Sequence, residues 1–318
     1  MAKRANMFAS HEQVGIREDL SDMIYNIDPT ETPVVTAIGI DNEQSGGNVL
    51  FDWQIDSLDT ADKDNAKIEG EDASAAALSA TTRLQNIMQI SDKVYGVTGT
   101  SRVQNGAGRN DELDYQRLKK GVALRKDIEA VLTAQHTAKQ AGNDSTARLT
   151  ANFGAWIASN VQTGAGGSAP TGDGTDVVAA GTPAAITEAK MKTALQNAWT
   201  LGAHPSLCFM PAAIKTTCNG FTGRADHVRG VDSEAVVYSN VDVFVTEFGT
   251  VEFIPCRDIE ANTVLGLDPE FAGVRYLRSF ETTPLAKMGD SDREQMIVEY
   301  GLKVANEKAH FMLAGQTG

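Results

Sequence analysis

Residues 49–97 read VLFDWQIDSLDTADKDNAKIEGEDASAAALSATTRLQNIMQISDKVYGV. Apolar residues alternate with mostly polar ones from residue 49 to residue 55, which is the pattern of a β-strand with one buried face. Residues 84–97 are the candidate return strand. Between the two runs, residues 57–81 carry six carboxylates against two lysines. The stretch therefore predicts a two-stranded ribbon that ends in a long acidic loop, and residues 57–81 are called the acidic loop below.

The acidic loop has too few apolar side chains to fold by itself. Fixing the backbone of about 25 residues costs on the order of 25–50 kcal/mol. Leu58, Ile68 and Leu78 would return roughly 5–9 kcal/mol if they were fully buried. The loop is therefore expected to be mobile or to be ordered by a neighbouring chain. The candidate subunit-interface residues in and beside it are Trp53, Leu58, Lys63, Lys67, Ile68, Glu69, Glu71 and Leu78.

Composition excludes several classes of protein. The chain has 318 residues, of which 42% are apolar, so it can bury a sizeable core and has a prior of about two domains. It has no apolar run long enough to span a membrane and no secretory signal at its start. A net charge of −14 disfavours a dedicated nucleic-acid binder. Three cysteines without a Cys-x-x-Cys pair disfavour a disulfide framework and fit a reducing cytoplasm.

Residues 110–139 give the best helical pattern in the chain. Asn110 is a suitable N-cap, and the apolar residues that follow cover one broad side. Arg125 and Glu129 are spaced as an i,i+4 ion pair, and Gly142 is the expected stop. About 29 residues predict a rod of roughly 43 Å. Such a helix suits a structural strut.

The N-terminal and middle segments predict an arm, a loop and a second helix. An amphipathic helix is expected near residues 20–27, and Val34, Val35 and Ile38 follow as apolar anchors. Residues 161–183 are rich in glycine and poor in apolar groups, which predicts an exposed, flexible loop. Thr187 is expected to begin the second helix.

The last third of the chain is expected to be mostly strand. Residues 207–210 form a short apolar run, and residues 241–253 have the pattern of a hairpin. Apolar residues occupy every second position over nine residues, and the chain is expected to stay extended as far as residue 313; these residues are Met296, Val298, Tyr300, Leu302 and Val304. Together with the helices, these strands predict an α+β fold.

No stretch of the sequence assembles recognisable chemistry. Nucleophile elbows and phosphate-binding loops are missing from the sequence. His204, Cys208, Cys218 and His227 fit none of the usual zinc spacings. The acidic turns Asp62-Lys-Asp64 and Asp173-Gly-Thr-Asp176 lack the ligands of a calcium site. The chain is therefore expected to be no enzyme and to hold no cofactor, with a hydrolase carboxylate site in the acidic loop or near His204 as the enzyme alternative.

The order of these segments resembles the major capsid proteins of tailed bacteriophages, which have the Hong Kong 97-type fold. The local sequence is similar to the podovirus-like branch of that family. The segments that carry the resemblance are Thr30-Glu-Thr-Pro33, Asp52-Trp-Gln-Ile-Asp-Ser-Leu58, Glu69-Gly-Glu-Asp-Ala73, Val241-Asp-Val-Phe-Val-Thr-Glu-Phe-Gly-Thr-Val251, Leu285-Ala-Lys-Met-Gly-Asp290, Val298-Glu-Tyr-Gly-Leu302 and Asn306-Glu-Lys-Ala-His310.

The resemblance implies a division of the chain and a role for each part. Residues 1–45 would form an N-terminal arm and residues 46–100 an extended loop across a neighbouring subunit. Residues 101–182 would form a peripheral domain, with a spine helix at 110–139. Residues 183–240 would form the axial domain, and residues 241–318 the remaining axial and peripheral strands.

The resemblance also implies a function and partners. Copies would assemble in the host cytoplasm into the hexamers and pentamers of an icosahedral phage head around double-stranded DNA. Expected partners are further copies of the chain, a separate scaffolding protein, a portal and decoration proteins, with DNA touched only non-specifically and no membrane. The alternative is another virion component, such as a portal, tail or decoration protein. Some relatives cross-link subunits through lysine and asparagine side chains, but no acceptor asparagine can be matched to Lys63 or Lys67, so no cross-link is assigned to them.

Overall fold

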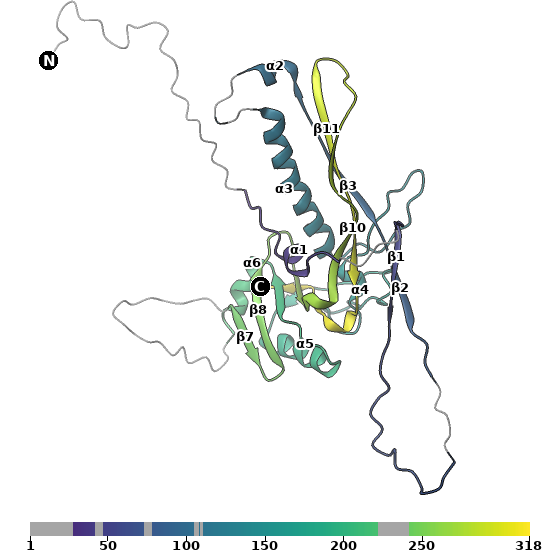
Figure 1. Ribbon diagram of the computed structural model, residues 1–318. Coiled ribbons are helices and arrows are strands. Elements are labelled where there is room, and N and C mark those ends of the chain that lie inside the picture. The colour runs from purple at the N-terminus through teal and green to yellow at the C-terminus, as the bar shows by residue number, and fades with distance from the viewer. Residues whose placement is uncertain (1–27, 42–46, 73–77, 105–107, 109–110, 222–241) are drawn as a thin grey trace, which may run out of the picture.

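The fold was analysed in a computed structural model that describes residues 28–41, 47–72, 78–104, 108, 111–221 and 242–318 (Figure 1). Helices and strands mix along the chain, and the α+β class is confirmed. Two larger sheets form the body, and a separate two-stranded ribbon carries the acidic loop. The predicted arm helix near residues 20–27 lies outside the described residues.

The three-stranded sheet has the order β10-β11-β3 and is antiparallel throughout. The long helix α3 lies along it (Figure 1). The strand predicted for residues 296–304 is confirmed and its five alternate apolar residues are buried, although Glu299 and Gly301 between them are buried as well. The bounds of these elements are β3 Gln89–Thr98, α3 Glu112–Thr133, β10 Ala272–Pro284 and β11 Ser291–Val304.

The six-stranded sheet has the order β4-β12-β9-β6-β8-β7. One face packs with α5 and α6 in a separate apolar cluster that includes Met191 and Phe253, and the other contributes Phe209 and Leu265 to the main core. The Thr187 side chain accepts a hydrogen bond from the Lys190 N–H, which confirms the predicted start of α5. The bounds are β4 Val161–Gln162, α5 Glu188–Thr200, β6 Leu207–Met210, α6 Ala212–Cys218, β7 Val243–Thr246, β8 Gly249–Pro255, β9 Thr263–Leu267 and β12 Phe311–Ala314.

The shorter elements join these sheets. β5 and β13 pair in parallel beside the six-stranded sheet, and two 3-10 turns flank the strands of the C-terminal third. The turn η3 interrupts the extended chain expected through residue 313, because β12 crosses to the other sheet. Their bounds are α2 Gly99–Val103, α4 Phe153–Trp156, β5 Ala184–Ala185, η2 Pro269–Phe271, η3 Glu307–Ala309 and β13 Gln316–Thr317.

Helix α3 is shorter than its sequence pattern predicts. It spans 22 residues, or about 33 Å, and its N-cap is Asp111, whose side chain accepts from the Leu113 N–H at 2.8 Å. Ala134 has extended backbone, and the Gln135 N–H donates to the Glu260 carboxylate at 2.6 Å. The helix therefore ends before Gly142, because a side chain from another segment takes over the backbone hydrogen bonding.

The predicted Arg125–Glu129 ion pair is wrong. Glu129 is fully buried, and its two carboxylate oxygens accept the Val34 and Val35 N–H groups at 2.9 and 2.8 Å. Those N–H groups begin helix α1, Pro33–Ile38, which has no side-chain cap from its own segment. The three predicted apolar anchors of this segment are buried. Burial raises the pKa of Glu129, and the α1 amides oppose that rise.

The predicted return strand is interrupted. Strand β2, Thr82–Ile87, pairs with β1, Leu50–Ile55, whereas the following strand β3 belongs to the three-stranded sheet. The break falls at Met88, which is fully buried and donates its N–H to the Val49 carbonyl at 2.8 Å. One continuous apolar pattern therefore serves two sheets.

The glycine-rich segment, residues 161–183, is only partly the exposed loop that its composition predicts. Val178 is buried and donates its N–H to the Gly154 carbonyl at 2.9 Å. Gly174 lies so close to Trp156 that an added Cβ would be 3.0 Å from the indole ring. Two isolated β-bridges also join the segment to itself. Glycine here permits close packing on the core.

Candidate subunit-interface surfaces

The acidic loop leaves the β1–β2 ribbon and extends away from both sheets (Figure 1). All of its described residues, 57–72 and 78–81, are exposed. Leu58 and Leu78 are each 97% exposed, and Ile68 is 78% exposed. Hydrogen bonds within the described part of the loop close local turns, such as Asp64 N–H to the Asp62 carboxylate at 2.9 Å. The loop therefore presents apolar groups that this chain leaves uncovered.

Seven of the eight candidate interface residues lie on this loop, and the eighth does not. Trp53 is 8% exposed and packs between Phe51 and Trp156, with ring centroids 5.8 and 5.1 Å away. Its position on the inward face of β1 places it in the core of its own chain. Trp53 is therefore removed from the interface set, which becomes Leu58, Lys63, Lys67, Ile68, Glu69, Glu71 and Leu78.

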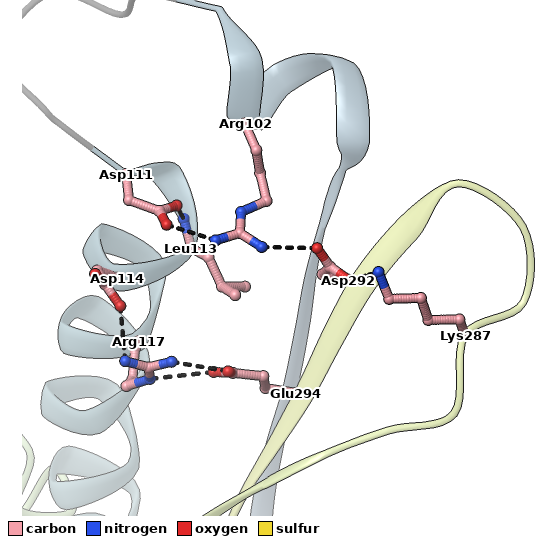
Figure 2. A network of polar contacts seen from close by, with 8 residues as sticks. All are labelled: Arg102, Asp111, Leu113, Asp114, Arg117, Lys287, Asp292 and Glu294. Carbon is pink, nitrogen blue, oxygen red and sulfur yellow. Dashed lines mark hydrogen bonds and ion pairs between the residues drawn. The ribbon is translucent and has the colours of Figure 1, made fainter.

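A second surface lies where α2, the start of α3 and the β10–β11 hairpin meet (Figure 2). Arg102 of α2 bridges Asp111 and Asp292, with both ion pairs at 2.7 Å. Lys287 reaches Asp292 from the hairpin at 2.5 Å. Lys287 and Arg102 together lower the pKa of Asp292, because each stabilises the carboxylate. These contacts join three segments into one corner of the molecule.

Arg117 extends the same network one turn along α3 (Figure 2). It pairs with Asp114 at 2.7 Å and with Glu294 at 2.8 Å, and the Tyr95 hydroxyl donates to Glu294 at 2.7 Å. Arg117 lowers the pKa of Glu294 by hydrogen bonding to its carboxylate. The contacts fix the hairpin against the helix. Sequence reasoning missed this network, because its partners are up to 190 residues apart along the chain.

Helix α3 exposes apolar groups on its outer side. Leu118 is 74% exposed and Val122 is 42% exposed, although sequence reasoning placed both on the apolar side that packs inward. Leu113, Leu124 and Ile128 do face the core. The broad apolar arc of α3 is wider than the strip that the three-stranded sheet covers.

A further apolar patch lies at the β7 edge of the six-stranded sheet. Phe244 is the inward residue of β7, so Val243 and Val245 point outward with exposures of 52% and 71%. Trp199 of α5 is 53% exposed, and its ring lies 5.8 Å from that of Phe248. This patch and the acidic loop are separate surfaces on one chain.

The candidate metal ligands do not form a site within the described residues. Cys208 and Cys218 are buried in the apolar cluster under α5, His204 is exposed, and His227 lies outside the described residues. Burial raises the pKa of Cys218 to about 11, so it stays a thiol. No cluster of three or more His, Cys, Asp or Glu side chains suited to a metal occurs in the described parts of the chain. None of the described helices has the length and apolar character to cross a membrane.

The Asp173 turn also has a structural explanation. Its carboxylate accepts the Thr175 N–H at 2.8 Å and the Thr171 hydroxyl at 3.0 Å. The Thr175 hydroxyl also donates to this carboxylate, at 2.5 Å. It is the largest cause of the lowered pKa of Asp173, and the other two hydrogen bonds add to it. The Oδ1 atom of Asp173 therefore closes this turn.

The sequence matches the SU10 major capsid protein family over residues 4–317. The chain belongs to this family. It is 33% identical over 126 residues to the major capsid protein of Escherichia phage Phieco32, a match that covers 40% of this chain and 35% of that protein. The match therefore spans about a third of the length of that relative.

Solved structures agree on the fold. A chain of the cyanophage A-1(L) capsid asymmetric unit has a TM-score of 0.65 at 13% identity, covering 98% of this chain and 99% of that one. A chain from Mycobacterium phage Che8 has a TM-score of 0.56 at 15% identity, with coverages of 94% and 96%. The chain therefore has the Hong Kong 97-type fold that its segment order predicts. The family match sets aside the portal, tail and decoration protein alternative.

Proposed function

We propose that this chain is the shell subunit of a tailed-phage head. Copies form the pentamers and hexamers of an icosahedral capsid around double-stranded DNA, and they assemble in the cytoplasm of the bacterial host. The observation that carries the proposal is the acidic loop, whose Leu58, Ile68 and Leu78 are nearly fully exposed in the single chain. Because the chain belongs to a family of major capsid proteins, other copies of the same chain are the proposed partners that bury these side chains.

In this proposal each part of the fold has a mechanical role. The three-stranded sheet with α3 forms the peripheral domain, and the six-stranded sheet with α5 and α6 forms the axial domain. Strand β4 at Val161–Gln162 lies in the six-stranded sheet, so the axial domain begins before residue 183. The extended loop of the proposal ends at residue 88 instead of residue 100, because β3 belongs to the three-stranded sheet. The arm, residues 1–45, overlaps neighbours only ahead of α1, because Val34 and Val35 are buried in the core of their own chain. Many modest contacts close the shell, so each can stay reversible during assembly.

The proposed role is structural and requires no catalytic group. Acidic residues that face the inside of the shell repel the packaged DNA, so the net charge of −14 limits adhesion of the DNA to the inner surface of the shell. A separate scaffolding protein, a portal and decoration proteins are the proposed partners besides the chain itself.

Removal of the acidic loop tests the proposal. Residues Ile55 and Thr82 are the last pair of the β1–β2 ladder, so replacing residues 57–81 by one glycine leaves Asp56-Gly as a two-residue turn. The variant should remain soluble with an unchanged unfolding midpoint, and it should form no particles in sedimentation and negative-stain microscopy. Normal particles from this variant would contradict the assigned role of the loop.

A further inference from the structure

The β1–β2 ribbon meets the body of the chain along one face. Phe51 and Trp53 of β1 and Asn86 of β2 are buried on that face, whereas their neighbours along each strand are exposed or half-buried. Phe51 lies directly opposite Asn86 in the ladder. Beyond Ile55 and Thr82, all described residues of the loop are exposed. The body therefore holds the described part of the ribbon at its base.

Apolar contacts hold this base in place. Phe51 lies so close to Gly301 of β11 that a Cβ added there would be 2.6 Å from the ring, and the Arg275 guanidinium is 5.2 Å from the ring centroid. Trp53 packs against Trp156. The hydrophobic effect is non-directional and depends on the area buried, so it selects an orientation less sharply than hydrogen bonds do.

Asn86 supplies directional contacts at the same place. Its side chain is fully buried, and its amide donates to the Leu302 carbonyl at 2.7 Å and to the Thr150 hydroxyl at 3.1 Å. Its Oδ1 accepts the Ala151 N–H at 3.0 Å and the Ile87 N–H at 2.8 Å. The Thr150 hydroxyl in turn accepts the Leu302 N–H at 3.2 Å. One side chain of the ribbon is thus tied to two separate segments of the body.

This network is satisfied in one orientation of the ribbon. Hydrogen bonds weaken steeply when their angle or length departs from the optimum, so a tilt of the ribbon would break several bonds of Asn86 at once. A buried donor or acceptor that loses its partner is destabilising, because water does not replace the partner. A fully satisfied buried network therefore specifies a single arrangement of the segments that it joins.

The acidic loop amplifies any tilt at its base. From the ribbon to its tip the loop has about 12 residues, which extend roughly 40 Å at most. Over that reach, a tilt of about 10° at the base would move an extended tip by about 7 Å. Neighbouring strands are about 4.8 Å apart, so the shift exceeds one strand spacing. A fixed base limits the volume in which the loop meets a second copy, and so reduces the entropy lost on contact.

We propose that Asn86 is the positioning residue that fixes the direction in which the ribbon presents the acidic loop. Because Asn86 is fully buried, it acts through hydrogen bonds within its own chain. The ribbon moves with the body as one rigid unit, and adaptation of the loop to different neighbours takes place beyond Ile55 and Thr82. The proposal rests on the shell function and names the residue on which presentation of the loop depends.

Distances between two spin labels on the full-length free subunit test the direction of the ribbon. Gln54→Cys on β1 and Lys192→Cys on α5 place the labels at exposed sites, and the native cysteines are at most 2% exposed. The labelled chain without further substitution should give one narrow distance distribution. Asn86→Ala should broaden it at least twofold. Thr150→Val, which removes two hydrogen bonds of the network with little change in shape, should do the same.

Asn152 supplies the matched control. It is also a fully buried asparagine, but neither of its side-chain polar atoms has a hydrogen-bond partner among the described residues. Asn152→Ala should leave the width of the distance distribution unchanged. If Asn86→Ala fails to fold, Thr150→Val carries the test. A lower thermal midpoint of Thr150→Val without broadening would show that the network only stabilises the fold, and this result would overturn the proposal.

The protein concentration needed for assembly separates this proposal from the shell function. Thr150→Val keeps the whole acidic loop, so it should still form particles, but the lowest concentration at which they sediment should rise at least fivefold. An unchanged threshold would overturn the role of Asn86 in presenting the loop. If the unmodified protein forms no particles and Thr150→Val still broadens the distances, the positioning of the ribbon is supported and the shell function is contradicted.

Discussion

The acidic loop and the glycine-rich segment 161–183 are alike in sequence, but only the glycine-rich segment packs part of its length on the core of its own chain. Each has three branched aliphatic residues among at least twenty small or polar ones. The glycine-rich segment is folded onto the core, with Val178 buried and Gly174 against Trp156. The acidic loop has all of its described residues exposed.

The difference lies in what each segment can reach within its own chain. The Gly174 carbonyl accepts the Lys139 N–H at 2.7 Å, and the Asp173 carbonyl accepts the Lys139 ammonium at 2.7 Å. Such hydrogen bonds to a fixed neighbour stabilise a segment that has little apolar surface. The acidic loop extends beyond any such neighbour, so apolar content alone does not predict which segment folds.

The largest expected effect on stability comes from removing the Trp156 side chain, on which the glycine-rich segment packs. Trp156→Ala should lower the free energy of unfolding by about 3–5 kcal/mol, because a fully buried indole leaves a cavity. Urea unfolding of the soluble subunit measures this change. Trp199→Ala, at a site 53% exposed, is the control and should cost less than about 1 kcal/mol. Equal losses would show that Trp156 does not support the fold.

Low pH should also reduce the free energy of unfolding, through the buried His310. His310 is fully buried against Phe153, its Nδ1 accepts the Asp268 N–H at 3.3 Å, and burial lowers its pKa from 6.5 to about 4. The unfolded chain binds this proton near pH 6.5 and the folded chain near pH 4. The stabilisation is therefore complete above pH 6.5 and declines by about 3 kcal/mol as the pH falls to 4.

Unfolding at a series of pH values for the unmodified protein and for His310→Gln measures this contribution. Both proteins keep the other titrating groups, including Glu129, so the difference between their pH profiles isolates His310. Parallel profiles between pH 6.5 and 4 would contradict the assignment.

A glycine-to-alanine substitution in each of the two segments compares how strongly each segment is packed. Gly174 has φ of +78° and lies near Trp156, so Gly174→Ala should cost about 1–2 kcal/mol. Gly70 of the acidic loop has φ of +85° with no neighbouring atom within 4 Å, so Gly70→Ala carries the backbone strain alone and should cost less than Gly174→Ala. The difference in thermal midpoint between the two variants is the measurement. A larger effect at Gly70 would reverse the comparison.

The smallest expected effect on stability comes from the loop side chains. Leu58→Ser combined with Leu78→Ser should change the free energy of unfolding of the single subunit by less than about 0.5 kcal/mol, because both side chains are 97% exposed. The yield of particles should fall, since the same side chains are proposed to be covered by a second copy. A destabilised subunit would show that the loop packs on its own chain.

Sequence reasoning succeeded where the pattern is local. The alternation over residues 296–304 predicted the buried face of β11, and Thr187 predicted the start of α5. Both depend on periodicity and on a cap within one element, which neighbouring residues suffice to specify.

Sequence reasoning failed where a distant segment decides the outcome. Glu129 was predicted to pair with Arg125 four residues away, yet it binds amides 94 and 95 residues away. Trp53 was predicted at a subunit interface, yet Trp156 covers it. A run of residues does not show which other run will lie beside it, so these contacts could not be predicted from either segment alone.

The amino-acid order by itself determined the strand and helix patterns, the acidic loop and its shortage of apolar side chains. Those properties depend only on residues that are close together in the sequence. The tertiary structure alone decided that α3 ends at Thr133, that Glu129 holds α1, and that the glycine-rich segment lies on Trp156. Each of these depends on hydrogen bonds or close packing between residues far apart in the chain, which form only when the whole fold brings them together.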